Sequence, residues 1–576
     1  MSSIDWIVLC LTLLSVILYG IYKSNRDQNI QAYFKSNNSI GWFLILLSIM
    51  GTQASAITFL SAPGQAYTDG MRFVQYYFGL PLAMIVICIS FIPIYQKLNV
   101  ITAYEFLEKR FDIKTRALAS VLFLTQRALS TGISIYAPSL ILSSLLGWNI
   151  YYTNIVMGGF LIIYTVIGGA KAVTYTQMQQ LLIVLIGMVL AGYMIVHLLP
   201  PDVSFGDALH VAGKMGKLNV IVTKIDVTDA AWWKDKYNIW SGLIGGFFLA
   251  LSYFGTDQSQ VGRYLSAKNS RESRLGLLIN GFVKVPMQFL ILMIGSLVFV
   301  FYLFYQSPIF FNQAQVDKVL AGPHKESLLQ LQKKQDTINF RKQLLSRQLT
   351  EAMRENNIGV IQSSQKALLI CNEDSKLIKN KTIELIKLTD AKADTNDTNY
   401  IFLYFVVHHL PKGLIGLLIA MIFLAAWGSI AAALNSLAST TVVDLYKRLW
   451  VKDKNEKHYY AAARWFTFAW GIFCVATAMF AGKLGSLIEA VNVLGSLFYG
   501  CILGLFLVAF YLPKIKAKAA FYACILTEIL VIAVYVSDSI SFLWLNVIGC
   551  LGMITIAWCL QLTLALKNQA RIGSEK

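Results

Sequence analysis

The feature that most constrains this chain is a series of apolar runs, each about 20 residues long, separated by mostly short polar segments. The hydrocarbon core of a bilayer is about 30 Å thick, so about 20 apolar residues in an α-helix cross it once. Only 14% of the residues are charged, against about 25% in a typical soluble domain. We therefore predict an all-α membrane protein with about thirteen transmembrane helices, expected near residues 4–22, 41–62, 73–96, 117–146, 150–170, 177–199, 238–260, 275–305, 411–443, 459–482, 485–511, 519–537 and 541–566.

The net charge of +18 lies mostly in loops, which argues against a nucleic-acid partner. Lys and Arg groups follow alternate spans, for example within 97–116 and 447–457, and such loops face the cytoplasm by the positive-inside rule. This pattern predicts an N-terminus outside and a C-terminus inside, in a protein of the cell (inner or plasma) membrane that is surrounded by lipid. The run 4–22 is too long for a signal-peptide core and no small-residue cleavage site follows it, so we expect a retained helix.

Two spans have a composition that is unusual for a lipid-facing helix. Each has an apolar half, a Gly-Thr-polar break and a polar half, with Gly51-Thr52-Gln53 in one and Gly255-Thr256-Asp257 in the other. Unwinding a membrane helix frees backbone carbonyls, which is tolerated only where they line a cavity or bind an ion. Matching interrupted spans in two halves of a chain indicate a transporter site. The alternative is that both breaks are seams of small residues where helices pack.

The two broken spans divide the chain into similar halves. Five spans between 41 and 199 begin with one break, and five between 238 and 511 begin with the other. Because each half has an odd number of spans, the second half must be inverted, which predicts a LeuT-type 5+5 inverted repeat with two broken helices. The expected segments are an N-terminal extra helix and loop (1–40), core helices 1–5 (41–199), an outer loop (200–237), core helices 6–10 (238–511), and two C-terminal helices with a short cytoplasmic tail (512–576).

A polar insertion at 306–399 interrupts the second half. It contains two runs with helical periodicity, 324–355 and 361–390, and resembles a helical hairpin with one buried stripe. We place it on the extracytoplasmic side, because long loops escape the charge rule. Docking of an extracytoplasmic partner and a tolerated insertion without a function are both open interpretations.

Several stretches resemble the sodium:solute symporter family, which includes proline, galactose, sialic-acid, glucose, iodide and vitamin cotransporters. They occur in the family's order and extend over most of residues 1–566 outside the insertion. The matching stretches are FIPIYQKLNVITAYEFLEKRF (91–111), IGGAKAVTY (167–175), SYFGTDQSQVGRYLSAKN (252–269), LPKGLIGLLIA (410–420) and AAALNSLASTTVVDLYKR (431–448).

The resemblance implies one sodium ion between the first broken helix and the eighth core helix. Carried over residue by residue, the ligands are three backbone carbonyls and the Ser429 hydroxyl, with the carbonyls supplied by Ala54, Ile57 and Ala425. Neutral oxygens suit a hard cation such as sodium.

Two departures from the family pattern bear on the coupling ion. The family usually has two adjacent hydroxylic residues at this site, whereas here Gly428 precedes Ser429. Water, Ser436 or Ser439 are candidates to replace the missing ligand. The family's Trp-Thr-Asp after IGGAKAV is Tyr-Thr-Gln here, so Gln177 replaces an acid tied to a second sodium in some members. One sodium at most is therefore expected, and proton coupling or ion-independent transport remains an alternative.

Three ionisable residues at membrane depth are candidates for the solute site: Asp257, Lys284 and Glu489. Lys284 matches a lysine near the substrate in sugar-transporting members. The alternative is that these groups form structural ion pairs, such as Asp257 with Arg263 or Lys284 with Glu489. Tyr253 stands where the family places a gating aromatic residue. Further substrate candidates by resemblance are Ala56, Thr58, Ser61, Gln75 and Tyr77.

The predicted function is a secondary active symporter that couples inward sodium movement to uptake of a small polar solute, such as a sugar, sugar acid, carboxylate or vitamin. No HExxH, nucleophile elbow or P-loop is found, so neither an enzyme nor an ATP-driven pump is expected. The alternatives are a solute sensor on the same scaffold and a passive channel.

Overall fold

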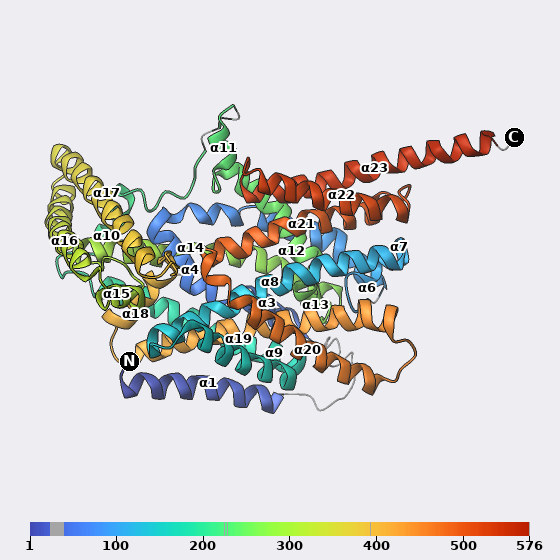
Figure 1. Ribbon diagram of the computed structural model, residues 1–576, viewed down its shortest axis with the longest axis horizontal. Coiled ribbons are helices and arrows are strands. Elements are labelled where there is room, and N and C mark those ends of the chain that lie inside the picture. The colour runs from blue at the N-terminus through green and yellow to red at the C-terminus, as the bar shows by residue number, and fades with distance from the viewer. Residues whose placement is uncertain (24–39, 99, 224, 227, 392, 575–576) are drawn as a thin grey trace.

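The computed structural model describes residues 1–23, 40–98, 100–223, 225–226, 228–391 and 393–574. The loop expected at 24–39 lies outside these residues, as do the side chains of 167–172 in the IGGAKAVTY stretch. In the described part of the chain, one isolated bridge between Ile40 and Ala267 is the sole β-type pairing. Most of the helices run side by side and share one long axis (Figure 1).

Ten helices in the described residues are long and apolar enough to cross a membrane, judged by length and composition. Three shorter apolar helices accompany them: Trp42–Gln53, Ile150–Val166 and Ser241–Thr256. Two of these short helices are the apolar halves of the predicted broken spans. The all-α membrane fold is confirmed, while the count of thirteen spans stays a prediction.

The first half of the bundle starts with a helix broken between Gln53 and Ala56. The expected spans at 150–170 and 177–199 belong to one helical run, in which Tyr164 Oη and Thr176 Oγ1 lie 2.6 Å apart. The elements are α3 (Trp42–Gln53), α4 (Ala56–Asp69), η2 (Gly70–Tyr77), α5 (Leu80–Val86), η3 (Ile87–Phe91), α6 (Ile92–Leu98), α7 (Glu105–Arg110), α8 (Ile113–Leu146) and α9 (Ile150–His197).

The second half starts with a helix broken at Asp257. Two short helices, α10 (Phe205–Lys214) and α11 (Ala230–Lys234), precede it. The elements are η4 (Ser241–Gly245), α12 (Gly246–Thr256), α13 (Gln258–Tyr264), α14 (Ser270–Phe304), α19 (Leu414–Thr440), η6 (Thr441–Trp450), α20 (Glu456–Ala478), η7 (Ala481–Lys483) and α21 (Leu487–Tyr511).

Three helices flank the two halves. Helix α1 (Ser3–Lys23) packs against α9 and α19, whereas α22 (Ala517–Val536) and α23 (Phe542–Ser574) pack against α21 and each other. The end of α1 that carries the N-terminus lies at the same end of the bundle as the insertion, and the C-terminus lies at the other end (Figure 1).

The insertion forms a helical hairpin that projects from one end of the bundle, which we call the hairpin end (Figure 1). Its arms pack along each other, and Asn356 between them has a positive φ of 55°. On α17, Lys379 forms an ion pair with Asp397, which starts the segment leading to α19. The elements are α15 (Gln313–Leu320), α16 (Lys325–Arg354), α17 (Ile358–Thr389), η5 (Thr398–Tyr400) and α18 (Ile401–His409).

Helices α4 and α14 pack backbone to backbone. A Cβ atom added to Gly295 would overlap the carbonyl oxygen of Pro63, so even the smallest side chain at 295 forces these helices apart. Gly159 on α9 is different, because a Cβ atom there meets no atom within 4 Å. The polar half of the first broken helix is therefore held against α14 by the absence of a side chain.

We predict that Gly295→Ala destabilises the protein by about 1–3 kcal/mol, the usual cost of overpacking a tight contact. The measurement is the apparent melting temperature of the detergent-purified protein. Gly159→Ala is the matched control. Its free energy of unfolding should stay within about 0.5 kcal/mol of the wild type, as expected for a side chain that meets no neighbour, so its melting temperature should be nearly unchanged. Equal melting of the two variants would contradict the close packing of α4 on α14.

Asp394 lies outside the spans, between α17 and η5, and its Oδ1 accepts a hydrogen bond from Asn396 N at 3.0 Å. Burial raises the pKa of this carboxyl from 3.8 to about 7, and the neighbouring Asp397 carboxylate adds to the increase. The folded state therefore binds a proton that the unfolded state releases between pH about 4 and about 7. Stability contributed by this group falls as the pH rises through that window.

We accordingly predict that the apparent melting temperature falls between pH 5 and pH 8, and that Asp394→Asn reduces this fall because the amide does not ionise. Thermal scans at both pH values in the same detergent measure it. A variant with an unchanged pH dependence would show that Asp394 is not the group responsible.

Candidate functional site

The first helix break leaves a backbone carbonyl without a partner. Ser55 between α3 and α4 is extended, with φ −85° and ψ 165°. Upstream, Thr52 Oγ1 donates to the Ser48 carbonyl at 2.8 Å, a bond that competes with regular helix formation. The carbonyl of the buried Ala54 accepts no hydrogen bond from the described residues. Because an orphan carbonyl is costly in a membrane interior, this oxygen is suited to an ion.

The second helix break is closed by side chains. Tyr95 Oη donates to the Gly255 carbonyl at 2.7 Å, and Tyr104 Oη donates to the Thr256 carbonyl at 3.0 Å. Asp257 caps α13 by accepting from Ser259 N at 2.8 Å. The last two carbonyls of α12 are therefore bonded by tyrosine hydroxyls. The Ala54 carbonyl at the first break has no such partner among the described residues.

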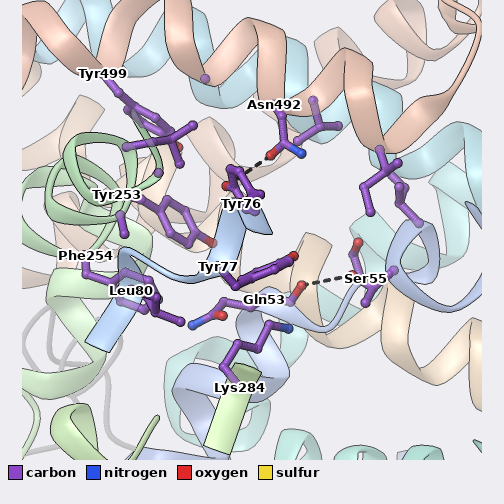
Figure 2. A pocket seen from close by; sticks show the side chains of 18 of the residues that line it. Gln53, Ser55, Tyr76, Tyr77, Leu80, Tyr253, Phe254, Lys284, Asn492 and Tyr499 are labelled. Carbon is purple, nitrogen blue, oxygen red and sulfur yellow. Dashed lines mark hydrogen bonds between the residues drawn. The ribbon is translucent and has the colours of Figure 1, made fainter. Parts of the chain in front are cut away.

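A cavity of about 140 Å³ lies beside both breaks (Figure 2). Four predicted substrate residues line it, and one predicted sodium ligand, Ile57, borders it. The four are Thr58, Tyr77, Tyr253 and Lys284. Further lining residues are Gln53, Ser55, Tyr76, Leu80, Gln126, Arg127, Gly246, Leu249, Ala250, Phe254, Ile488, Val491, Asn492, Gly495 and Tyr499.

Tyrosines form much of the polar lining of the cavity. Tyr76 Oη donates to Asn492 Oδ1 at 3.3 Å, and the rings of Tyr76 and Tyr77 meet edge to face at 4.7 Å. The Tyr253 ring points toward the same space in Figure 2, and Gln260 Nε2 donates to its hydroxyl at 2.7 Å. The walls therefore offer flat apolar faces and hydroxyl groups together, as polar organic ligands require.

Arg127 on α8 was missed in the sequence analysis. Its guanidinium lines the cavity, forms an ion pair with Asp257 and donates to Tyr499 Oη at 2.9 Å. The suggested Asp257–Arg263 pair is wrong, because Arg263 Nη1 instead donates to Thr174 Oγ1 at 3.1 Å. Asp257 itself does not line the cavity. The rule that a charge inside a span marks a functional site would have found Arg127.

Lys284 on α14 is 2% exposed and lines the cavity. Its ammonium makes a cation–π contact with the Tyr77 ring, with 5.9 Å from Nζ to the ring centre. None of the ion pairs in the described chain includes Lys284, so the suggested pair with Glu489 is wrong. Glu489 pairs instead with Lys236, at 2.9 Å, near the start of α21. A buried cation without a counter-ion favours an anionic ligand.

Four other predicted substrate residues do not line this cavity: Ala56, Ser61, Gln75 and Glu489. Ser61 Oγ donates to Asn399 Oδ1 at 2.7 Å, which ties α4 to η5. Gln75 bonds the backbone of Tyr237 and Val222, and Ala56 is buried at the start of α4. Ser61 and Gln75 point to other parts of the bundle because their amide and hydroxyl groups are already used there.

Gln177 of α9 lies where α3, α9 and α19 meet. Its Nε2 donates to the Gly428 carbonyl at 2.9 Å and to Thr52 Oγ1 at 3.1 Å, while its Oε1 accepts from Ser48 Oγ at 2.9 Å. The side chain is fully buried and uses both ends of its amide. Gln177 therefore joins the first broken helix to α19 with neutral hydrogen bonds.

Ser429 lies next to this junction and is 8% exposed. Its Oγ donates to the carbonyls of Ala425 and Ala426 at 3.0 and 3.1 Å, which leaves the oxygen lone pairs available to a cation. Ser436 and Ser439 were candidates to replace the missing ligand. They lie 7 and 10 residues further along α19, or about 10 and 15 Å away, so they are too distant for this site.

The comparisons with known proteins agree with this architecture. The sequence profile described as the sodium:solute symporter family matches residues 33–323 and 381–527, so the arms of the hairpin are largely outside the match. The chain is 25% identical to the sodium/sialic acid symporter SiaT of Proteus mirabilis, over 96% of this chain and 93% of that protein. It is 24% identical to the sodium-dependent multivitamin transporter of Oryctolagus cuniculus, over 89% of this chain and 67% of that protein.

A solved structure confirms the fold. It is a substrate-bound outward-open state of a Na⁺-coupled sialic acid symporter, with a TM-score of 0.74 and 23% sequence identity over 97% of this chain and 98% of that chain. The predicted LeuT-type architecture is thus confirmed. With the profile matching most of its length, this chain belongs to the sodium:solute symporter family.

Proposed function

We propose that this protein couples inward sodium movement to the uptake of a small polar solute that carries a carboxylate, such as a sugar acid. One observation carries the proposal: two cations, Lys284 and Arg127, line the cavity, while Asp257 neutralises only Arg127. The remaining positive charge favours a carboxylate, and the tyrosines suit a polar organic body. Relatives named as sialic acid symporters agree with a sugar acid.

The proposed sodium site combines the carbonyls of Ala54, Ile57 and Ala425 with the Ser429 hydroxyl. The residues fit the ion, because the Ala54 carbonyl has no other partner in the described chain and Ser429 keeps free lone pairs. Gln177 places an amide rather than a carboxylate at the α3–α9–α19 junction, so we propose one sodium per transport cycle. The ion travels with the solute as cargo and is not a resident cofactor.

The coupling follows from shared use of the first broken helix. Ala54 and Ile57 would bind sodium, while Ser55 and Thr58 of the same short stretch line the solute cavity. A sodium ion that orders this stretch also orders the solute contacts. Ion and solute would therefore strengthen each other's binding, typically by about 1–3 kcal/mol.

We place the hairpin end of the bundle outside the cell and the C-terminus inside. Lys97, Lys109 and Arg110 lie near α6 and α7, at the end opposite the hairpin (Figure 1), as the positive-inside rule requires for a cytoplasmic face. Near the proposed outer end, Ser486 Oγ donates to Gln65 Oε1 at 3.0 Å, which joins the start of α21 to α4. A partner of the exposed hairpin would then be extracytoplasmic. The proposed transport involves binding and release of the ion and the solute and needs no covalent step.

We predict that sodium raises the apparent melting temperature of the purified protein more than potassium or choline at equal ionic strength. A ligand that binds only the folded state stabilises it by about 2.7 kcal/mol at a hundredfold excess over Kd. In Ser429→Ala, the sodium-specific increase should be largely lost, because a ligand oxygen is removed. A wild-type protein that melts alike in all three salts would contradict sodium coupling and favour a proton gradient.

We also predict that Lys284→Met lowers sodium-driven uptake of a carboxylate solute about 10- to 100-fold, the range expected for losing one charge-assisted hydrogen bond. Uptake of radiolabelled sialic acid and smaller carboxylates into proteoliposomes measures it. Lys236→Met is the matched control, since Lys236 pairs with Glu489, neither residue lines the cavity, and half of the Lys236 side chain is exposed. Equal loss in both variants, or uptake restricted to uncharged sugars, would refute the assignment.

A further inference from the structure

Gln180 on α9 is a buried amide without a hydrogen-bond partner. It is 3% exposed, and both its Oε1 and Nε2 lack a partner in the described chain. Gln177, one turn earlier, uses both ends of its own amide. A buried and unsatisfied amide costs about 1–3 kcal/mol. Such a group needs a partner that the polypeptide does not supply, and a bound ion or water can provide one.

The Gln180 amide oxygen points at α19 beside the proposed sodium site. A Cβ atom added to Gly428 would overlap Gln180 Oε1 and lie 3.2 Å from Gln177 Cγ. The space that a side chain at 428 would fill is therefore taken by the Gln180 carboxamide. Gly428 directly precedes Ser429, so this oxygen contacts α19 at the position adjacent in sequence to the proposed ligand Ser429.

The same oxygen is also level with the orphan carbonyl of the first break. A Cβ atom on Gly51 of α3 would lie 3.1 Å from Gln177 Cβ, and further along both helices Phe59 and Met188 line one apolar pocket. The first broken helix and this part of α9 thus advance in the same direction. Ala54 and Gln180 each lie three residues beyond the Gly51–Gln177 contact, about 4.5 Å along. Gln180 therefore reaches the level of Ala54.

We propose that Gln180 Oε1 is a ligand of the sodium ion and supplies the oxygen that Gly428 does not. Sodium takes several oxygen ligands, and an amide oxygen is as suitable as a carbonyl or hydroxyl. The absent side chain at 428 makes room for the longer carboxamide of Gln180, so the two residues act as one unit. This inference rests on the proposed sodium site between α3 and α19.

The test is a sodium titration of the apparent melting temperature of the detergent-purified protein, with choline keeping the ionic strength constant. We expect Gln180→Ala to raise the apparent Kd for sodium about tenfold or more, and Gln180→Asn to have a smaller effect of the same sign. Gln179→Ala is the matched control on the neighbouring residue and should titrate like the wild type. Melting in choline alone shows whether each variant is folded.

A double variant makes the test specific. Gly428→Ser alone should weaken sodium binding, because the new side chain displaces the Gln180 carboxamide. Gly428→Ser combined with Gln180→Ala removes the overlap and places a hydroxyl beside Ser429, so sodium affinity should return to within a few-fold of the wild type. A purely structural Gln180 would give additive losses instead of this recovery.

The outcomes separate the two proposals. If the wild type responds to sodium and Gln180→Ala titrates identically, then Gln180 is not a ligand, although sodium coupling stands. If the wild type shows no sodium-specific shift, both the sodium site and the role of Gln180 are overturned.

Discussion

The structure depends on one constraint, which is that each backbone polar group inside a bilayer needs a partner. Both broken helices lose regular helix hydrogen bonds at the break, and the carbonyls freed there have different partners in the two cases. At the second break, the hydroxyls of Tyr95 and Tyr104 donate to the carbonyls of Gly255 and Thr256, so side chains replace part of the lost helix bonding. At the first break, the Ala54 carbonyl is left for an ion in the described structure. The two halves of the inverted repeat therefore differ in how the carbonyls at their helix breaks are bonded.

The charged side chains near the cavity also differ in whether they have a partner. Asp257 is held by Arg127, Tyr499 and Ser259, and Glu489 is held by Lys236 and Tyr237, so neither carboxylate is available to a cationic solute. Of the two cations that line the cavity, Arg127 pairs with Asp257, whereas Lys284 has no acid partner in the described chain. The selectivity for an anionic solute would then come from leaving one cation unpaired, and not from adding charge. Such a site disfavours neutral analogues because they leave Lys284 buried and unpaired.

The sequence was sufficient for the helices, the two breaks and part of the cavity, because these depend on local composition. Gly-Thr followed by a polar residue marks both breaks, and Lys284 is conspicuous in an apolar span. The ion pairs could not be predicted in this way. Arg127 and Asp257 are separated by 130 positions in the chain, and Glu489 lies in the first turn of α21, where it pairs with Lys236. Pairing of this kind is decided by which helix faces pack together, which no local pattern encodes.

Helix packing also changes how the glycine at 428, where the family usually has a hydroxylic residue, is interpreted. Taken alone, a glycine in place of a hydroxylic residue subtracts one ligand from a cation site. In the packed structure the Gln180 carboxamide occupies the space beside this glycine, and its unpaired oxygen is the ligand that we propose in place of the missing hydroxyl. Under this proposal, the ligand lost from α19 is replaced by one from α9. Coupling-ion preference in this chain therefore has to be argued from the α3–α9–α19 junction as a whole, since no one of its helices contains the complete set of ligands.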